Sequence, residues 1–196
     1  MAQSISIETT NIRSIKANNV SECRKKLKLL LTNKPDIAII TECHLTDKHV
    51  ELMERNFRYE LADYRCVVSP NDRRGILALI KKSITLNYSS IINGNILKLG
   101  VETSDIKIAV IAVYAPSQGQ DVDFFLKVRS VQLNCEEPHQ LICGDFNTTL
   151  DKILDKSRYL TDSLWITREV VGKWIDSRQQ ERQPSLRYLQ ALRPLL

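Results

Sequence analysis

The sequence is built from short apolar runs, and the longest of them, residues 108–115, spans only eight positions. Runs of this length cannot cross a bilayer, but they match strands whose two faces are both buried. With turn residues as boundaries, we expect strands around Ile5 and Ile7 and at residues 37–40, 64–69, 75–80, 84–91, 96–102, 106–114 and 141–143. Such strands, mixed with helices, predict a layered α/β protein. The consecutive strands from 64 to 114 predict antiparallel sheet on one side.

Three segments have the apolar spacing of helices. The first begins at Ser21, and its apolar positions are Cys23, Leu27, Leu30 and Leu31. We interpret its other face as a solvated surface, with Arg24, Lys25, Lys26 and Lys28. The second helix is expected near residues 48–57. The third is expected at 120–133, with inward-facing Val122, Phe125, Leu126 and Val131.

The character of the chain changes after residue 150. Residues 162–176 have helical spacing, and residues 179–187 form a polar stretch that contains a proline. We therefore expect an incomplete domain over residues 1–160 and a helical segment with a divergent tail over residues 161–196.

The composition is that of a folded protein, with 43% hydrophobic and 26% charged residues, which excludes global disorder. A net charge of +5 permits a polyanionic partner such as nucleic acid without requiring one. The five cysteines include no C-x-x-C pair, so neither a disulfide framework nor a zinc ribbon is indicated, and Cys66 and Cys143 are expected in the core. With no signal peptide in view, we expect an intracellular protein that does not bind membranes.

Polar residues follow several of the expected strands. They are Asn11, Glu42, Tyr114 and the pair Asp145 and Asn147. Ligands of α/β proteins gather beyond the carboxyl ends of strands, so these residues from distant parts of the chain are candidates for one shared site.

Their chemistry is that of metal-assisted phosphodiester hydrolysis. Glu42 is an oxygen ligand suited to Mg²⁺, and Asn11 could position the metal or Asp145. Asp145 could orient or deprotonate a water molecule, while Asn147 and Tyr114 could donate hydrogen bonds to phosphate oxygens. Structural interpretations are also available, because Asp-Phe-Asn is a common turn sequence and Tyr114 could simply pack its ring at a strand end.

Five motifs carry a family resemblance. They are Asn-Ile-Arg-Ser from Asn11, Thr-Glu-Cys-His-Leu from Thr41, Gly-Ile-Leu-Ala-Leu from Gly75, Val-Tyr-Ala-Pro from Val113 and Gly-Asp-Phe-Asn from Gly144. In this order they resemble the endonuclease/exonuclease/phosphatase superfamily, which is DNase I-like, and within it the apurinic-endonuclease-like domain of LINE-type (non-LTR) retrotransposons. The resemblance covers about residues 4–155.

The resemblance implies a four-layer α/β sandwich of two packed sheets flanked by helices, acting as a DNA-nicking endonuclease that depends on Mg²⁺, with Mn²⁺ as a substitute. Asn11 and Glu42 would sit at the metal site. Tyr114 would contact the scissile phosphate, and Asp145 and Asn147 would handle the water and the transition-state charge. DNA would be the partner, with no small-molecule cofactor, and the location would be nuclear. His44 belongs to the signature, but we assign it no chemical role beyond a hydrogen bond that fixes the strand end.

The sequence departs from the family after Asn147. The family's site is completed by a Ser-Asp-His element, whereas the histidines of this chain, His44, His49 and His139, all precede Asn147. We therefore expect the C-terminal strands of the second sheet to be missing and the chain to be truncated. Two alternatives stay open: a catalytically inactive remnant that retains at most nucleic-acid binding, and a lipid or nucleotide phosphatase of the same superfamily.

Overall fold

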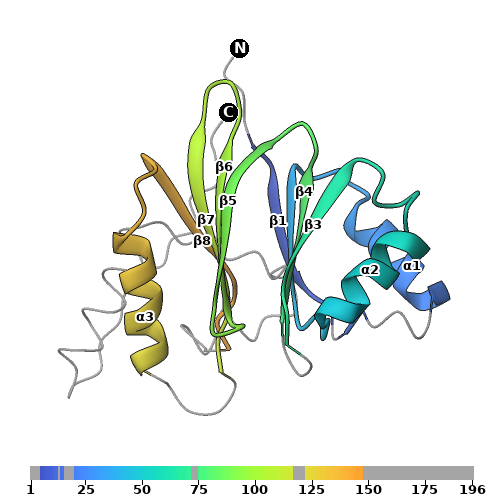
Figure 1. Cartoon of the computed structure of the whole chain (residues 1–196), viewed down its shortest axis with the longest axis horizontal. Helices are drawn as coiled ribbons and strands as arrows, with labels where there is room; N and C mark the ends of the chain where they lie inside the picture. Colours follow the sequence, from blue (N-terminus) through green and yellow to red (C-terminus); the bar gives the residue numbers. More distant parts are fainter. Residues whose placement is uncertain (1–4, 13, 16–19, 72–74, 117–121, 148–196) are drawn as a thin grey trace, which may run out of the picture.

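The computed structural model describes residues 5–12, 14–15, 20–71, 75–116 and 122–147. Two four-stranded sheets pack face to face, with α1 and α2 outside the first sheet and α3 outside the second (Figure 1). The elements are β1 (Ile7–Asn11), α1 (Val20–Leu30), β2 (Ile37–Thr41), α2 (Asp47–Asn56), β3 (Tyr64–Ser69), β4 (Ile76–Lys81), β5 (Thr85–Ile92), β6 (Ile96–Glu102), β7 (Lys107–Tyr114), α3 (Val122–Leu133) and β8 (His139–Asp145). This arrangement confirms the four-layer α/β sandwich.

Each sheet contains one parallel pair of strands. The first sheet has the order β1-β2-β4-β3, in which β1 and β2 are parallel. The second has the order β5-β6-β7-β8, in which β7 and β8 are parallel. The prediction that strands from 64 to 114 form one antiparallel sheet is wrong, because β3 and β4 join the first sheet and β5, β6 and β7 join the second. Local patterning could not show this division, since β4 and β7 are both apolar apart from a lysine at one end.

Alternate residues of the central strands enter different cores, which explains the continuous apolar runs. In β2, Ile37 and Ile39 lie in the core between the sheets, whereas Ala38 and Ile40 lie in the core beneath α1 and α2. In β7, Val110 and Ala112 face the inter-sheet core, as does Tyr114 at the strand end. Tyr114 is only 6% exposed.

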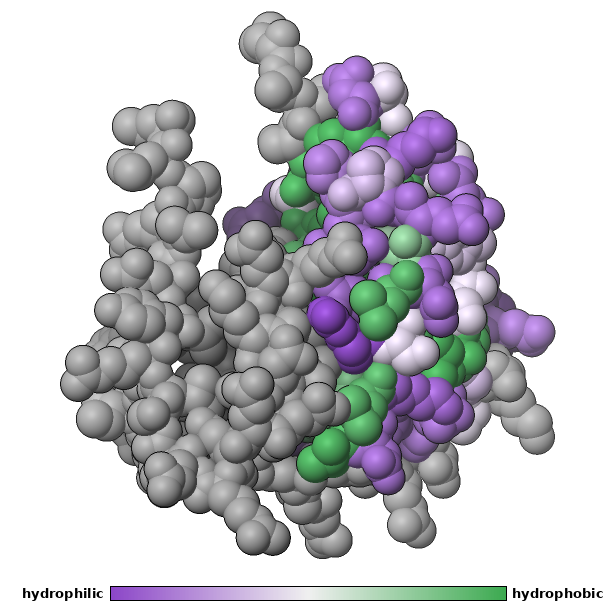
Figure 2. All heavy atoms as spheres, turned by 90° about the vertical axis from the view of Figure 1, so that its left-hand side faces the viewer, coloured by the Kyte–Doolittle hydropathy of each residue, from purple (hydrophilic) through white to green (hydrophobic). Residues whose placement is uncertain are grey.

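The inward face of α3 differs from the prediction. Its buried residues are Phe124, Phe125, Val128 and Gln132. Val122 and Leu126 are exposed, and the prediction for these two residues is wrong. The rings of Phe124 and Phe125 meet edge to face and pack on the second sheet together, which rotates the helix away from the predicted face. Figure 2 views this side of the molecule, where small hydrophobic areas lie among hydrophilic ones.

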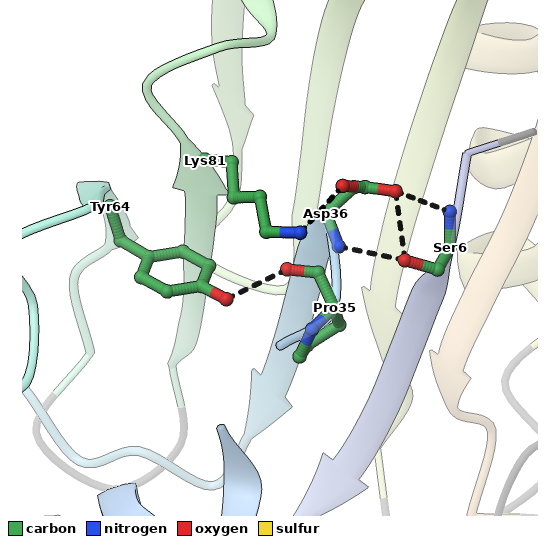
Figure 3. A network of polar contacts seen from close by, with 5 residues as sticks. All are labelled: Ser6, Pro35, Asp36, Tyr64 and Lys81. Atoms are coloured by element: carbon green, nitrogen blue, oxygen red, sulfur yellow. Dashed lines mark hydrogen bonds and ion pairs between the residues drawn. The ribbon is translucent and has the colours of Figure 1, made fainter. Parts of the chain in front are cut away.

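A polar network links neighbouring strands of the first sheet at the end where β1 and β2 begin (Figure 3). The Asp36 carboxylate accepts hydrogen bonds from the Ser6 backbone N–H at 2.9 Å, the Ser6 hydroxyl at 2.8 Å and Lys81 Nζ at 2.8 Å. Beside it, the Tyr64 hydroxyl donates to the Pro35 carbonyl oxygen at 2.9 Å. Burial alone would raise the pKa of Asp36, but the hydrogen bonds from Lys81 and Ser6 outweigh burial and lower it.

All five cysteines are free thiols. Cys143 is buried as expected, whereas Cys66 is only half-buried. None of the helices in the described part of the chain has the length and apolar character needed to cross a membrane. The helix expected at 162–176, the polar stretch at 179–187, the boundary at 160 and the missing C-terminal strands all lie outside the described residues.

Candidate active site

The two parallel strand pairs bring their carboxyl ends to the same end of the sandwich. Asn11, the last residue of β1, pairs in register with Thr41, the last residue of β2. Tyr114, the last residue of β7, pairs with Asp145, the last residue of β8. Because β1 and β2 also contact β8 across the gap between the sheets, the carboxyl ends of these strands lie near one another (Figure 1).

Asn11 and Asp145 form the first direct link between the sheets. Asn11 Nδ2 donates a hydrogen bond to Asp145 Oδ2 at 2.9 Å, although the two residues are 134 positions apart in the sequence. The other carboxylate oxygen, Oδ1, accepts the backbone N–H of Asn147 at 2.8 Å. Both oxygens of Asp145 therefore have a donor, which fixes the plane of the carboxylate.

Tyr114 and Glu42 form the second link. The Tyr114 hydroxyl donates to Glu42 Oε1 at 2.7 Å. Burial, together with the adjacent Glu42 carboxylate, raises the pKa of Tyr114 to about 12, while a hydrogen bond from Asn147 acts in the opposite direction. A phenol with this pKa keeps its proton at neutral pH, so Tyr114 acts as a hydrogen-bond donor.

Asn147 extends the link between Asn11 and Asp145. Its side-chain Nδ2 donates to the Ala115 carbonyl oxygen at 2.6 Å, and its φ of 45° lies in the left-handed region, which asparagine tolerates better than most residues. Asn147 thus belongs to the Asn11–Asp145 link, while Tyr114 and Glu42 form a second pair beside it. The structure thus brings all five predicted site residues to the same end of the sandwich, in two hydrogen-bonded groups.

Glu42 occupies a turn directly after β2. Its φ is 54°, and that of His44 is 53°, while the intervening Cys43 is fully buried. The backbone carbonyl of Glu42 accepts the N–H of Ser14 at 2.7 Å, which ties the turn to the segment after β1. The side chain of His44 makes no hydrogen bond with the described residues, so the bond expected to fix the strand end is not formed among them.

Two features of the site were missed in the sequence. The first is Gly144, whose φ is 128° and at which a Cβ atom would lie 2.0 Å from the Val113 carbonyl oxygen. Only glycine lets β8 end this close to β7, and its position directly before Asp145 was the available signal. The second is the Ala115 carbonyl that holds Asn147. It carried no signal, because any residue has a backbone carbonyl.

The donor set is compatible with a hard divalent cation. Among the residues that the structure describes, no three His, Cys, Asp or Glu side chains gather into a closed metal cage. Mg²⁺ does not need one, since it binds through one or two carboxylates and keeps several waters. Glu42 offers a half-buried carboxylate at the same end of the sandwich as the Asn11 amide, and both side chains carry oxygen atoms that can bind a metal. The residues present therefore fit Mg²⁺ or Mn²⁺ by ligand chemistry.

Protein-family models give no match to this chain, and curated protein sequences give none either. Solved structures do match. D. rerio TDP2 matches in a humanized form with 20% identity, a TM-score of 0.58 and coverage of 78% of this chain and 70% of that chain. A complex of D. rerio TDP2 with single-strand DNA product gives a TM-score of 0.58, with 16% identity and coverage of 77% and 64%.

An AP endonuclease from Archaeoglobus fulgidus matches with 17% identity and a TM-score of 0.57, over 76% of this chain and 60% of that chain. An endonuclease/exonuclease/phosphatase family protein from Bacteroides thetaiotaomicron matches with 11% identity and a TM-score of 0.54, over 73% and 63%. The chain thus spans about 60–70% of the length of these structures. At these identities the likeness concerns architecture, and it shows that this chain has the endonuclease/exonuclease/phosphatase fold.

Proposed function

We propose that the chain is a divalent-metal-dependent phosphodiesterase that nicks DNA. The observation that carries this proposal is the pair of cross-sheet hydrogen bonds, Asn11 to Asp145 and Tyr114 to Glu42. They place two carboxylates, an amide and a phenol at one end of an endonuclease/exonuclease/phosphatase fold. The structural neighbours support the substrate class, because they include AP endonucleases and a TDP2 complex with single-strand DNA product.

In the proposed reaction Asp145 holds the attacking water and takes its proton. Its carboxylate is oriented by Asn11 on one oxygen and by the Asn147 backbone on the other. A fixed carboxylate within hydrogen-bonding reach of the water is what general base catalysis requires. Asn11 therefore has two proposed roles: it orients the Asp145 carboxylate, and it is a candidate metal ligand.

Tyr114 and Asn147 serve the phosphate. The Tyr114 hydroxyl is protonated at neutral pH, and a phosphate oxygen can replace Glu42 as its acceptor. The bond from Asn147 Nδ2 to the Ala115 carbonyl fixes the plane of the amide before substrate arrives. Donors fixed in this way stabilise charge that develops in the transition state.

Glu42 and Asn11 would hold the metal ion. A bound Mg²⁺ or Mn²⁺ would polarise the phosphate and stabilise the leaving oxygen. The forms Asn-Ile-Arg-Ser and Thr-Glu-Cys-His-Leu favour a retroelement endonuclease over a lipid or nucleotide phosphatase. The proposed role is a nick in nuclear DNA that primes reverse transcription.

Nicking of supercoiled plasmid by the full chain with Mg²⁺ tests the proposal. We expect Asp145→Asn to lower the nicking rate about 100-fold or more, since a general base contributes at least this much. Glu42→Gln should also lower the rate, because it removes the proposed carboxylate ligand of the metal. Asp105→Asn removes the same charge from an exposed turn and should leave the rate unchanged. Equal rates for the chain and its Asp145→Asn variant would refute the proposal.

The alternative of a binding module without catalysis is favoured by one observation, the net charge of +5, which suits a polyanionic partner. It predicts that the chain binds oligonucleotides and that the logarithm of the binding constant falls linearly with the logarithm of the salt concentration. Fluorescence anisotropy alongside the nicking assay separates the two functions. Binding without nicking would establish the alternative, and nicking would exclude it.

A further inference from the structure

The side chain of Lys26 on α1 lies against the segment that follows β1. Its Nζ donates hydrogen bonds to the backbone carbonyl of Ile12 at 3.1 Å and to that of Ser14 at 3.0 Å. The Glu22 carboxylate, one helical turn earlier, lies 3.5 Å from the same nitrogen. A lysine ammonium has three donors and no acceptor, so it can hold both carbonyls and Glu22 at once.

This contact distinguishes Lys26 from the other basic residues of α1. Arg24 pairs with Glu60 at 2.7 Å, and Lys25 and Lys28 are exposed. The side chain of Lys26 is only 31% exposed. The interpretation of this face as a solvated surface therefore holds for Lys25 and Lys28 but not for Arg24 and Lys26.

The segment that Lys26 holds is tied to the backbone around Glu42. Beyond the ends of β1 and β2, the ladder continues with N–H groups of Ile12, Ser14 and Ile15 donating to carbonyls of Thr41, Glu42 and Cys43 at 3.4, 2.7 and 3.1 Å. Ile15 is fully buried and anchors the far side of the segment. A shift of this segment would therefore move Glu42 on one side and Asn11 on the other.

Ser14 and Glu42, the two residues at the centre of this contact, both have unfavourable backbone conformations. The φ of Ser14 is 81° and that of Glu42 is 54°, and non-glycine residues keep such angles only where their surroundings fix them. A charge-assisted hydrogen bond is about twice as strong as a neutral one. Lys26 makes such bonds to the carbonyls of Ile12 and Ser14. The Ser14 N–H, which lies between them in the chain, donates to the Glu42 carbonyl.

We propose that Lys26 is a positioning residue of the active site, which fixes Glu42 and Asn11 through the backbone of Ile12, Ser14 and Ile15. The inference rests on the proposed function for its effect on rate, and it adds a residue that contacts neither substrate nor metal. Its chemistry differs from that of a DNA-binding lysine, because its donors are directed at backbone carbonyls of the protein itself.

The test compares Lys26→Met with Lys25→Met. Both variants remove one positive charge from neighbouring positions of α1, so any general loss of attraction for DNA is shared. We expect Lys26→Met to lower kcat for nicking about 10- to 100-fold, the range for residues that orient metal ligands, with KM for DNA equal to that of Lys25→Met. Lys26→Arg, which keeps charged donors, should recover part of the rate. Equal kcat for Lys26→Met and Lys25→Met would overturn the proposal.

Two readouts stand apart from nicking. Hydrogen exchange of the Ser14 and Ile15 amides should be faster in Lys26→Met than in Lys25→Met, and Mn²⁺ alone, followed by electron paramagnetic resonance, should bind more weakly. If the unmodified chain does not nick DNA, the proposed function fails, while these two measurements still decide whether Lys26 positions the site. Unchanged exchange and unchanged Mn²⁺ affinity would overturn the positioning role whatever the outcome for nicking.

Discussion

The Tyr114 hydroxyl donates a 2.7 Å hydrogen bond to Oε1 of Glu42, so a side chain from the inter-sheet core joins the two sheets at the candidate active site. The ring is buried among apolar residues, whereas the hydroxyl reaches the polar end of the sandwich. One residue thus couples the packing of the sheets to the orientation of Glu42. Changes at Tyr114 should consequently affect stability and activity together.

Tyr114→Phe removes this hydroxyl and leaves the ring. We expect the nicking rate to fall about 100-fold, as when one transition-state donor is lost, and the free energy of unfolding to fall by about 1–3 kcal/mol, because Glu42 loses a donor. Plasmid nicking and urea denaturation measure the two effects. Tyr64→Phe is the matched control, since it removes a buried hydroxyl bonded to Pro35. It should lower stability and leave the rate intact, and an equal loss of rate in both variants would contradict the assignment.

The raised pKa of Tyr114 predicts an effect of alkaline pH on stability. Below the ordinary pKa of 10.0 the hydroxyl is protonated in both the folded and the unfolded chain, so its contribution is fully present. As the pH rises toward about 12, the unfolded chain ionises first, and the contribution is lost. The free energy of unfolding should therefore fall less between pH 9 and pH 11 in Tyr114→Phe than in the unmodified chain. Tyr64 and Tyr88 also have raised pKa values, so the difference between the two chains, not the absolute slope, is the measurement.

Asp36 predicts the opposite dependence at acid pH. Its pKa lies below the ordinary value of 3.8 because the hydrogen bonds from Lys81 and Ser6 outweigh the effect of burial. The stability that it contributes is present above the unfolded pKa and is lost as the pH falls through the folded pKa. At pH 7, Asp36→Asn should be less stable by about 1–3 kcal/mol, and the difference should shrink toward pH 3. A difference that stays constant with pH in urea denaturation would show that the charge of Asp36 does not matter.

The candidate site could be predicted from the sequence further than the arrangement of the sheets could. Asn11, Glu42 and Asp145 could each be found locally, because each ends or follows a strand. The contact between Asn11 and Asp145 joins residues 134 positions apart, and it depends on which strands lie at the facing edges of the two sheets. Apolar alternation does not carry that information when both faces of a strand are buried.

Two predictions about the fold are wrong, the assignment of strands to sheets and the buried face of α3, and both depend on packing that local sequence does not specify. β4 and β5 are consecutive and close in sequence, yet they belong to different sheets, and no turn signal distinguishes a hairpin from a crossing between sheets. The apolar spacing of α3 predicts that Phe125 and Leu126 both face inward. In the structure, Phe125 is buried together with its neighbour Phe124, and Leu126 is exposed. Hydrophobicity alone ranks these side chains similarly, and the shape of the surface formed by the second sheet decides between them.

Gly144 shows how tightly the backbone constrains the site, and Gly144→Ala tests it. A Cβ atom there would lie 2.0 Å from the Val113 carbonyl oxygen, at a φ of 128°. We expect the substitution to lower the free energy of unfolding by about 3 kcal/mol or more, through overlap and backbone strain together, and to abolish nicking because Asp145 is displaced. Gly94→Ala is the control, since its φ is also positive but its nearest contact would be a side-chain nitrogen at 3.2 Å. Gly94→Ala should cost about 1 kcal/mol with nicking retained, and equal losses for the two variants would show that the approach of β8 to β7 does not set the geometry of Asp145.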